Sequence, residues 1–242
     1  PASSGILASK LSVPNVLSMV AVYGVLLIIG LFLLLRKFPL PKRKKQQEKE
    51  KLHWNIGIIK SYGGAFFLMF SQGVLAYLLP IHVQDLGYGS RMSGTLLSVF
   101  GIVAVLIFIL PTNRIFDYVN AQVTLLIGVT LLGAAQIGIG LAQETLLLYG
   151  ILAVYGVGFA FLFPSINSIL IEATTEKTRG KAYGYFYAFF SIGVVAGSSL
   201  LGILDLVGTP GFVFTGTVLF SFSLFVLVSI LKSRVPLLKA RA

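Results

Sequence analysis

Seven long apolar runs, none of which contains Lys, Arg, Asp or Glu, restrict this chain to a membrane-embedded fold more strongly than any other feature. With about 1.5 Å of rise per helical residue, each run can cross roughly 30 Å of hydrocarbon as a helix. Strands of a barrel would alternate apolar and polar residues in segments of about ten, and no such alternation is present. The sequence therefore predicts an all-α integral membrane protein, a polytopic helix bundle with seven transmembrane helices. The predicted spans are Asn15 to Leu35, Ser61 to Val83, Met92 to Leu110, Val123 to Ala142, Thr145 to Ile171, Tyr183 to Leu204, and Phe212 to Leu231.

Composition agrees with this fold class. Of the 242 residues, 56% are hydrophobic and 11% are charged, and the mean hydropathy is +0.92. Soluble domains carry about 25% charged residues. The chain has no cysteine, which excludes disulfides, metal–thiolate sites and cysteine nucleophiles.

The segment from Arg36 to Lys60 is dense in positive charge. It holds nine of the 19 Lys and Arg residues and only two acids, Glu48 and Glu50. In isolation such a run usually marks a solvated linker. Between membrane helices, the positive-inside rule places it in the cytoplasm, and alternate crossing then leaves only Lys10 and Arg91 on the outer side.

This topology predicts a multi-pass protein of the cell membrane whose basic linker and C-terminus are cytoplasmic. The formal net charge of +11 then needs no nucleic-acid partner, because Lys and Arg beside helix ends attract anionic lipid headgroups. The chain begins with Pro1 rather than Met, and PASSGILASKL reads like the outer end of a helix whose body lies upstream. The sequence is therefore expected to be part of a longer protein.

The loop after the third run, N-R-I-F-D-Y-V-N-A-Q, carries a family resemblance. It is similar to the G-R-L-x-D-R-x-G-R-R signature of major facilitator superfamily transporters. Arg114 and Asp117 match that signature, whereas Asn113 and Asn120 replace its glycines and Tyr118 replaces its central basic residue. The alternative interpretation is an ordinary polar turn.

The fifth and sixth runs extend the resemblance. A glycine-rich helix with Pro164, a turn containing Arg179, and a second glycine-patterned helix are similar in order and spacing to the family's tenth and eleventh helices. Gly193 and Gly197 form a small-xxx-small face that lets another backbone approach closely, whether for sliding or for static packing. The opening PASSG is similar to the G-P-x-x-G-G motif of exporters, so the chain resembles the drug/proton antiporter branch.

The resemblance implies half of a twelve-helix major facilitator fold plus one helix. Residues 1–35 would hold the outer end of a fifth helix and the sixth helix of the N-terminal half. Residues 36–60 would be the basic cytoplasmic linker between the halves, 61–231 the six-helix C-terminal half, and 232–242 a cytoplasmic tail. Such transporters bind substrate between halves that rock alternately open to each side. The expected partners are membrane lipids, the N-terminal half of the same transporter and a small-molecule substrate.

The resemblance also implies site residues. Arg114, Asp117 and Arg179 would form a conformational switch at the cytoplasmic turns. Gln72 would either line a cavity or make a helix-packing hydrogen bond. Gln136 lies on a helix expected to be peripheral, and the sequence offers no role for it. The substrate-binding candidates are aromatic or weakly polar: Phe66, Met69, Gln72, Tyr155, Phe159, Asn167, Phe186 and Phe189.

The predicted function is secondary active transport by alternating access, with proton-coupled efflux of drug-like or amphipathic compounds. The alternative is a nutrient, metabolite or lipid carrier of the same fold. No cofactor or metal is expected, and the proton gradient would be the driving force. All eight acidic residues lie outside the apolar runs, so a coupling carboxylate would belong to the other half. A seven-helix receptor would not explain the two signature turns, and a membrane enzyme should carry catalytic residues within its spans.

Overall fold

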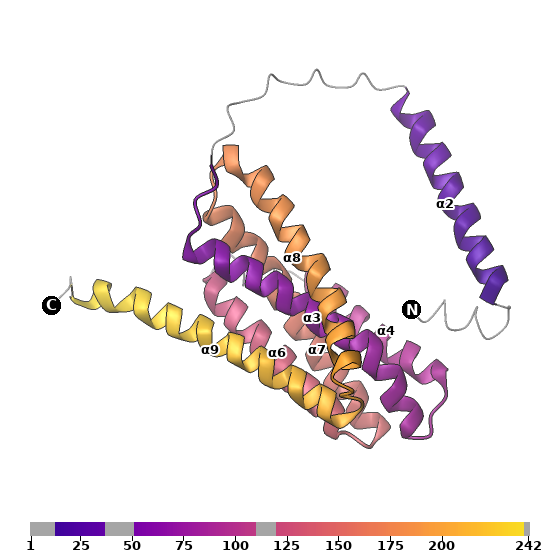
Figure 1. Cartoon of the computed structure of the whole chain (residues 1–242). Helices are drawn as coiled ribbons and strands as arrows, with labels where there is room; N and C mark the ends of the chain where they lie inside the picture. The colour runs from indigo at the N-terminus through magenta and orange to yellow at the C-terminus, as the bar shows by residue number, and fades with distance from the viewer. Residues whose placement is uncertain (1–12, 37–50, 110–119, 240–242) are drawn as a thin grey trace. The chain divides into compact units, whose positions relative to one another are not determined.

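A computed structural model describes residues 13–36, 51–109 and 120–239, which form seven α-helices and no strand (Figure 1). This confirms the predicted all-helical fold class. The helices are α2 (Val13–Leu35), α3 (Ile56–Asp85), α4 (Ser90–Ile109), α6 (Ala121–Leu141), α7 (Thr145–Glu172), α8 (Glu176–Ile203) and α9 (Thr209–Lys239).

The chain divides into two units, residues 1–49 and 50–242, and the described part of the first, residues 13–36, forms helix α2. The side chains described along α2 are exposed almost throughout, although the helix is aliphatic. Its apolar stretch runs over Ala21–Leu34. A helix that is apolar on every side can leave its side chains uncovered by protein only if lipid or another helix surrounds it.

The described part of the second unit, residues 51–109 and 120–239, holds six helices that are long and apolar enough to cross a membrane, namely α3, α4, α6, α7, α8 and α9. Several begin before or end after the predicted spans: α3 starts at Ile56 rather than Ser61, and α8 starts at Glu176 rather than Tyr183. Hydropathy predicts only the part of a helix that lies in the hydrocarbon layer of the membrane, so helical turns beyond that layer are missed. The first turn of α8 lies outside that part and is stabilised by a capping box between Thr175 and Thr178.

Helix α3 is the centre of the six-helix unit, since it contacts each of the other helices there. Helix α6 packs on α7 and α9, and α4 packs on α7. The residues of α3 supply much of the buried core, including Leu68, Val74, Leu75 and Leu78, which have no exposed surface.

The contact between α3 and α8 brings two backbones together. A Cβ added at Gly193 would collide with the carbonyl oxygen of Phe66, and one added at Gly197 would collide with that of Phe70. Gly73 meets the α8 backbone in the same way from the opposite side. The close approach predicted from the glycine spacing is therefore present, and α3 is the helix that makes it.

Two asparagines cap helices at the end of the unit where α3 begins. Asn120, which stands where the family signature has a glycine, accepts a hydrogen bond from the Gln122 amide at 2.8 Å. Its φ of −56° is an ordinary value, so it serves as an N-cap and not as a left-handed turn residue. Asn55 caps α3 through the Ile58 amide and donates to the Ala173 carbonyl, at the end of α7, at 2.9 Å.

Candidate functional site

Gln72 lies midway along α3 and is half-buried. Its Nε2 atom is buried and has no hydrogen-bond partner among the described residues. Ala76, one turn further along α3, is exposed, so this face of the helix opens to the surface of the six-helix unit. A buried amide donor inside a membrane needs a partner, which water, a ligand or a further segment of protein can supply.

A row of aromatic rings connects α4 to α7. The ring centroids of Phe100 and Phe159 are 5.4 Å apart, and those of Phe159 and Phe163 are 6.0 Å apart. Both α7 rings are half-buried, so their outer edges remain accessible. Rings in this arrangement present an apolar and polarisable surface to anything that contacts them.

Asn167 continues this row toward α8. Its Nδ2 donates to the Phe163 carbonyl at 2.8 Å, and its Oδ1 accepts a long hydrogen bond of 3.3 Å from the Tyr183 hydroxyl. The Tyr183 ring lies 6.2 Å from that of Tyr187, which is exposed. The sequence-predicted residues Phe159 and Asn167 therefore belong to one row of side chains from α4, α7 and α8, which we call the aromatic surface, and in it Asn167 joins the α7 rings to Tyr183.

Three other predicted binding residues are covered by protein. Tyr155 has no exposed surface, Phe186 has 1% and Met69 has 8%. Met69 lies at the α3–α8 contact, where an added Cβ at Gly193 would meet its Cβ at 3.1 Å. These side chains are buried inside the six-helix unit, and their contact with a ligand stays a prediction.

A buried polar cluster of Ser71, Tyr155 and Gln136 ties three helices together. The Gln136 Nε2 donates to both the carbonyl oxygen and the hydroxyl of Ser71 at 2.9 Å, and the Tyr155 hydroxyl lies 2.8 Å from the Ser71 hydroxyl. Gln136 is fully buried, and its Oε1 has no partner among the described residues. The structure thus gives Gln136 a role that the sequence did not: it joins α6 to α3. The sequence signal for this role is the amide itself, because it stands in the middle of an apolar run.

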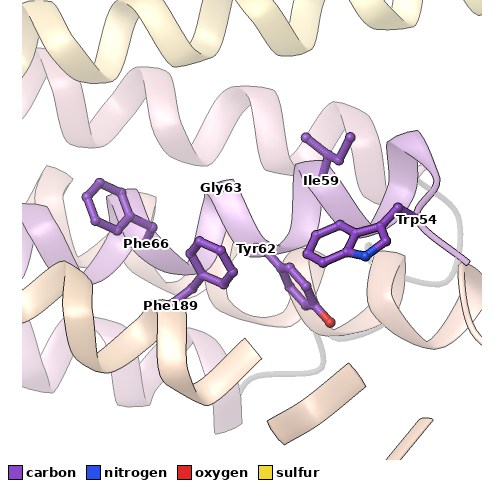
Figure 2. A pocket seen from close by; sticks show the side chains of 6 residues that line it. All are labelled: Trp54, Ile59, Tyr62, Gly63, Phe66 and Phe189. Atoms are coloured by element: carbon purple, nitrogen blue, oxygen red, sulfur yellow. The ribbon is translucent and has the colours of Figure 1, made fainter. Parts of the chain in front are cut away.

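Phe66 and Phe189 meet in a different place, a cavity of about 340 Å³ that we call the side pocket. Gly63 marks its position, because a Cβ there would lie 2.7 Å from the Phe222 ring of α9. Gln72 is nine residues further along α3, about 180° around the helix. The side pocket therefore faces away from the Gln72 face. It is lined by Trp54, Ile59, Tyr62, Gly63, Phe66 and Phe189 (Figure 2).

Of the three predicted switch residues, Arg114 and Asp117 lie outside the described residues. Arg179 is half-buried near the start of α8, and its Nε is buried without a hydrogen-bond partner in the described part of the chain. Sequence reasoning missed Lys60, which is buried at the start of α3 and donates to the Gln122 side-chain oxygen at 2.7 Å. In the sequence, Lys60 is one of the nine basic residues of the segment from Arg36 to Lys60, and nothing there distinguishes it from the others.

The chain matches known proteins over most of its length. Residues 61–241 match the family model described as Major Facilitator Superfamily. Multidrug resistance protein 1 and Multidrug resistance protein 2 of Bacillus subtilis (strain 168) are each 24% identical over 139 residues, 57% of this chain. The aligned region is 36% of the first and 34% of the second, so the chain matches about a third of each relative. With its six apolar helices and its family match, the chain is a multi-pass membrane protein that belongs to the major facilitator superfamily.

Proposed function

We propose that this chain forms the C-terminal half of a secondary active transporter that exports drug-like or amphipathic compounds by alternating access. Members of the family are transporters, and the names of the two relatives refer to multidrug resistance. A second six-helix half would close the cavity against the Gln72 face. The match covers only about a third of each relative. The activity of the whole protein is therefore inferred from the side of the cavity that this chain would form.

The observations that carry the proposal are the accessible aromatic surface on α4, α7 and α8 and the unpaired amide of Gln72 on the open face of α3. Phe159, Phe163 and Tyr187 offer apolar contact without fixed hydrogen-bonding geometry, which suits ligands of varied shape. The free Nε2 donor of Gln72 can orient a ligand that carries one acceptor.

Proton coupling is the proposed energy source. The apolar runs of this chain carry no carboxylate, so the protonated group would be supplied by the other half. The distribution of Lys and Arg supports a cell-membrane orientation in which the linker 36–60 and the C-terminus face the cytoplasm.

A nutrient, metabolite or lipid carrier of the same fold is the second candidate. Carriers of polar solutes need several fixed donors and acceptors, because each buried polar group of the solute must be paired. Among the predicted cavity residues, only Gln72 and Asn167 carry amides, and Asn167 already bonds within the protein. This shortage favours the exporter.

Transport in everted vesicles tests the proposal directly. Vesicles containing the full-length protein should accumulate a lipophilic cationic dye when respiration acidifies the lumen, and a protonophore should abolish this accumulation. Vesicles without the protein are the control. Accumulation of a sugar or an amino acid, with no movement of dye, would overturn the exporter in favour of the second candidate.

A further inference from the structure

We propose that the side pocket binds one acyl chain of an anionic phospholipid from the leaflet on the linker side of the membrane, with its headgroup at Lys181 and Lys51. The inference goes beyond the proposed function and rests on it only in one respect: the Gln72 face is taken to meet the other half, which leaves the side-pocket face to lipid.

The lining of the side pocket suits a hydrocarbon chain. Its six lining residues carry no charge, and the hydroxyl of Tyr62 is already used, since it donates to the Ala182 carbonyl at 2.9 Å. The Tyr62 and Phe189 rings stack with centroids 5.3 Å apart and make a flat apolar wall. A polar ligand would find almost no hydrogen-bond partner there, whereas methylene groups would lose contact with water and gain contact with rings.

The orientation of the pocket also fits a lipid. It extends along α3 from Ile59 to Phe66, which at about 1.5 Å per residue is roughly 10 Å. Trp54 is 60% exposed at one end, and its ring lies 6.3 Å from that of Tyr185, which is 44% exposed. Exposed Trp and Tyr side chains gather at the level of lipid headgroups. A chain entering beside Trp54 therefore runs inward from the headgroup level.

Positive charge stands at the mouth of the pocket. Lys181 is exposed and precedes Tyr185 by four residues and Phe189 by eight, so the three lie on one face of α8. Lys51, also exposed, lies three residues before Trp54. Among the described residues, no acid lies on the Lys181–Tyr185–Phe189 face. An anionic headgroup is therefore favoured over a zwitterionic one.

Trp54 is the chain's only tryptophan, so its fluorescence reports on the pocket. The test reconstitutes the 242-residue chain in phosphatidylcholine nanodiscs with a small, equal fraction of either phosphatidylglycerol or phosphatidylcholine carrying brominated acyl chains. We expect brominated phosphatidylglycerol to quench Trp54 with about fivefold stronger apparent association, which is roughly the contribution of one Lys beside an anionic headgroup. The assay needs no transport, so its failure is distinguishable from failure of the exporter proposal.

Two variants and one control variant identify the site. Lys181→Gln should bring the two lipids to within about twofold of each other, while Arg91→Gln, the same charge change at the other end of the bundle, should leave the preference intact. Ile59→Phe fills the pocket at a position that is 45% exposed, and it should lower quenching by both lipids at least twofold.

Three results would overturn the assignment. Equal quenching by both lipids would remove the headgroup contact. Quenching unaffected by Ile59→Phe would show that the chains touch Trp54 outside the pocket. Release of quenching by a lipophilic dye would make the occupant a drug-like compound.

Discussion

The side-chain nitrogen of Gln136 lies 2.9 Å from the hydroxyl of Ser71, on a different helix and without exposure to the surface. Tyr155 adds a third helix to the same contact. Hydrogen bonds between membrane helices contribute about 0.6 kcal/mol each on average. The Oε1 of Gln136 is buried without a described partner, which offsets part of that gain.

Gln136→Leu should therefore destabilise the chain only modestly, by about 1 kcal/mol, because the variant loses two donated bonds but also removes an unpaired oxygen. Denaturation in mixed detergent micelles measures the change. Gln143→Leu, an exposed amide just beyond α6, is the matched control and should be neutral. A loss above about 3 kcal/mol would mean that Gln136 organises far more than the three-residue cluster.

Gln72→Ala should weaken ligand binding by about fivefold in the full-length protein, because it removes one hydrogen-bond donor worth about 1 kcal/mol. Thermal stability should hardly change, since Nε2 has no described partner to lose. Dye titration and a melting curve on the same preparation give both quantities. A lower melting temperature with unchanged affinity would instead make Gln72 a packing residue.

Gly197→Ala should destabilise the chain by about 1–3 kcal/mol, because the added Cβ collides with the backbone of α3 at Phe70, which cannot rotate away. Gly184→Ala on the same helix is the matched control, since nothing lies within 4 Å of its added Cβ. Unfolding in detergent should separate the two variants. If both behaved alike, helix propensity and not the close approach would explain the glycines.

Asp117→Asn should raise the accessibility of cavity residues from the cytoplasm and lower transport, with near-normal folding. In the family whose signature the loop resembles, the equivalent carboxylate holds the two halves together. Such a contact at a helix N-terminus contributes about 1 kcal/mol. Single cysteines introduced into the cysteine-free chain, within the full-length protein, report accessibility by labelling. Asp205→Asn, near the opposite end of α8, is the control. Labelling that matches the parent would leave Asp117 as a turn residue only.

The 242-residue chain alone, reconstituted in liposomes, should carry no dye above the level of empty liposomes under an imposed proton gradient. Under the proposed function, the cavity would take its second wall and its coupling carboxylate from another half. Flux by the isolated chain would show that six or seven helices suffice, for example through association of two copies.

The helices themselves were predictable from sequence because uncharged apolar runs leave the backbone no other way to cross hydrocarbon. The α3–α8 contact was predictable only in part. The spacing of Gly193 and Gly197 indicated that another helix approaches α8 closely, but it did not indicate which helix. The direction of each side chain was not predictable. Phe189 belongs to the side pocket because of the rotation of α8 about its axis, and nearly uniform hydrophobicity leaves that rotation unmarked. For the same reason Gln136 had no visible partner.

Asn55 links the start of α3 to the end of α7 through two hydrogen bonds. Its Oδ1 holds the first turn of α3, and its Nδ2 holds the carbonyl of Ala173. Asn55 lies within the basic segment 36–60, directly before the first residue of α3, so a pull on the residues that precede it reaches α3 and α7 together. Three residues after Ala173 comes the first turn of α8, which carries Arg179. Tension in the linker would thus arrive at the Arg179 turn without passing through the middle of the membrane.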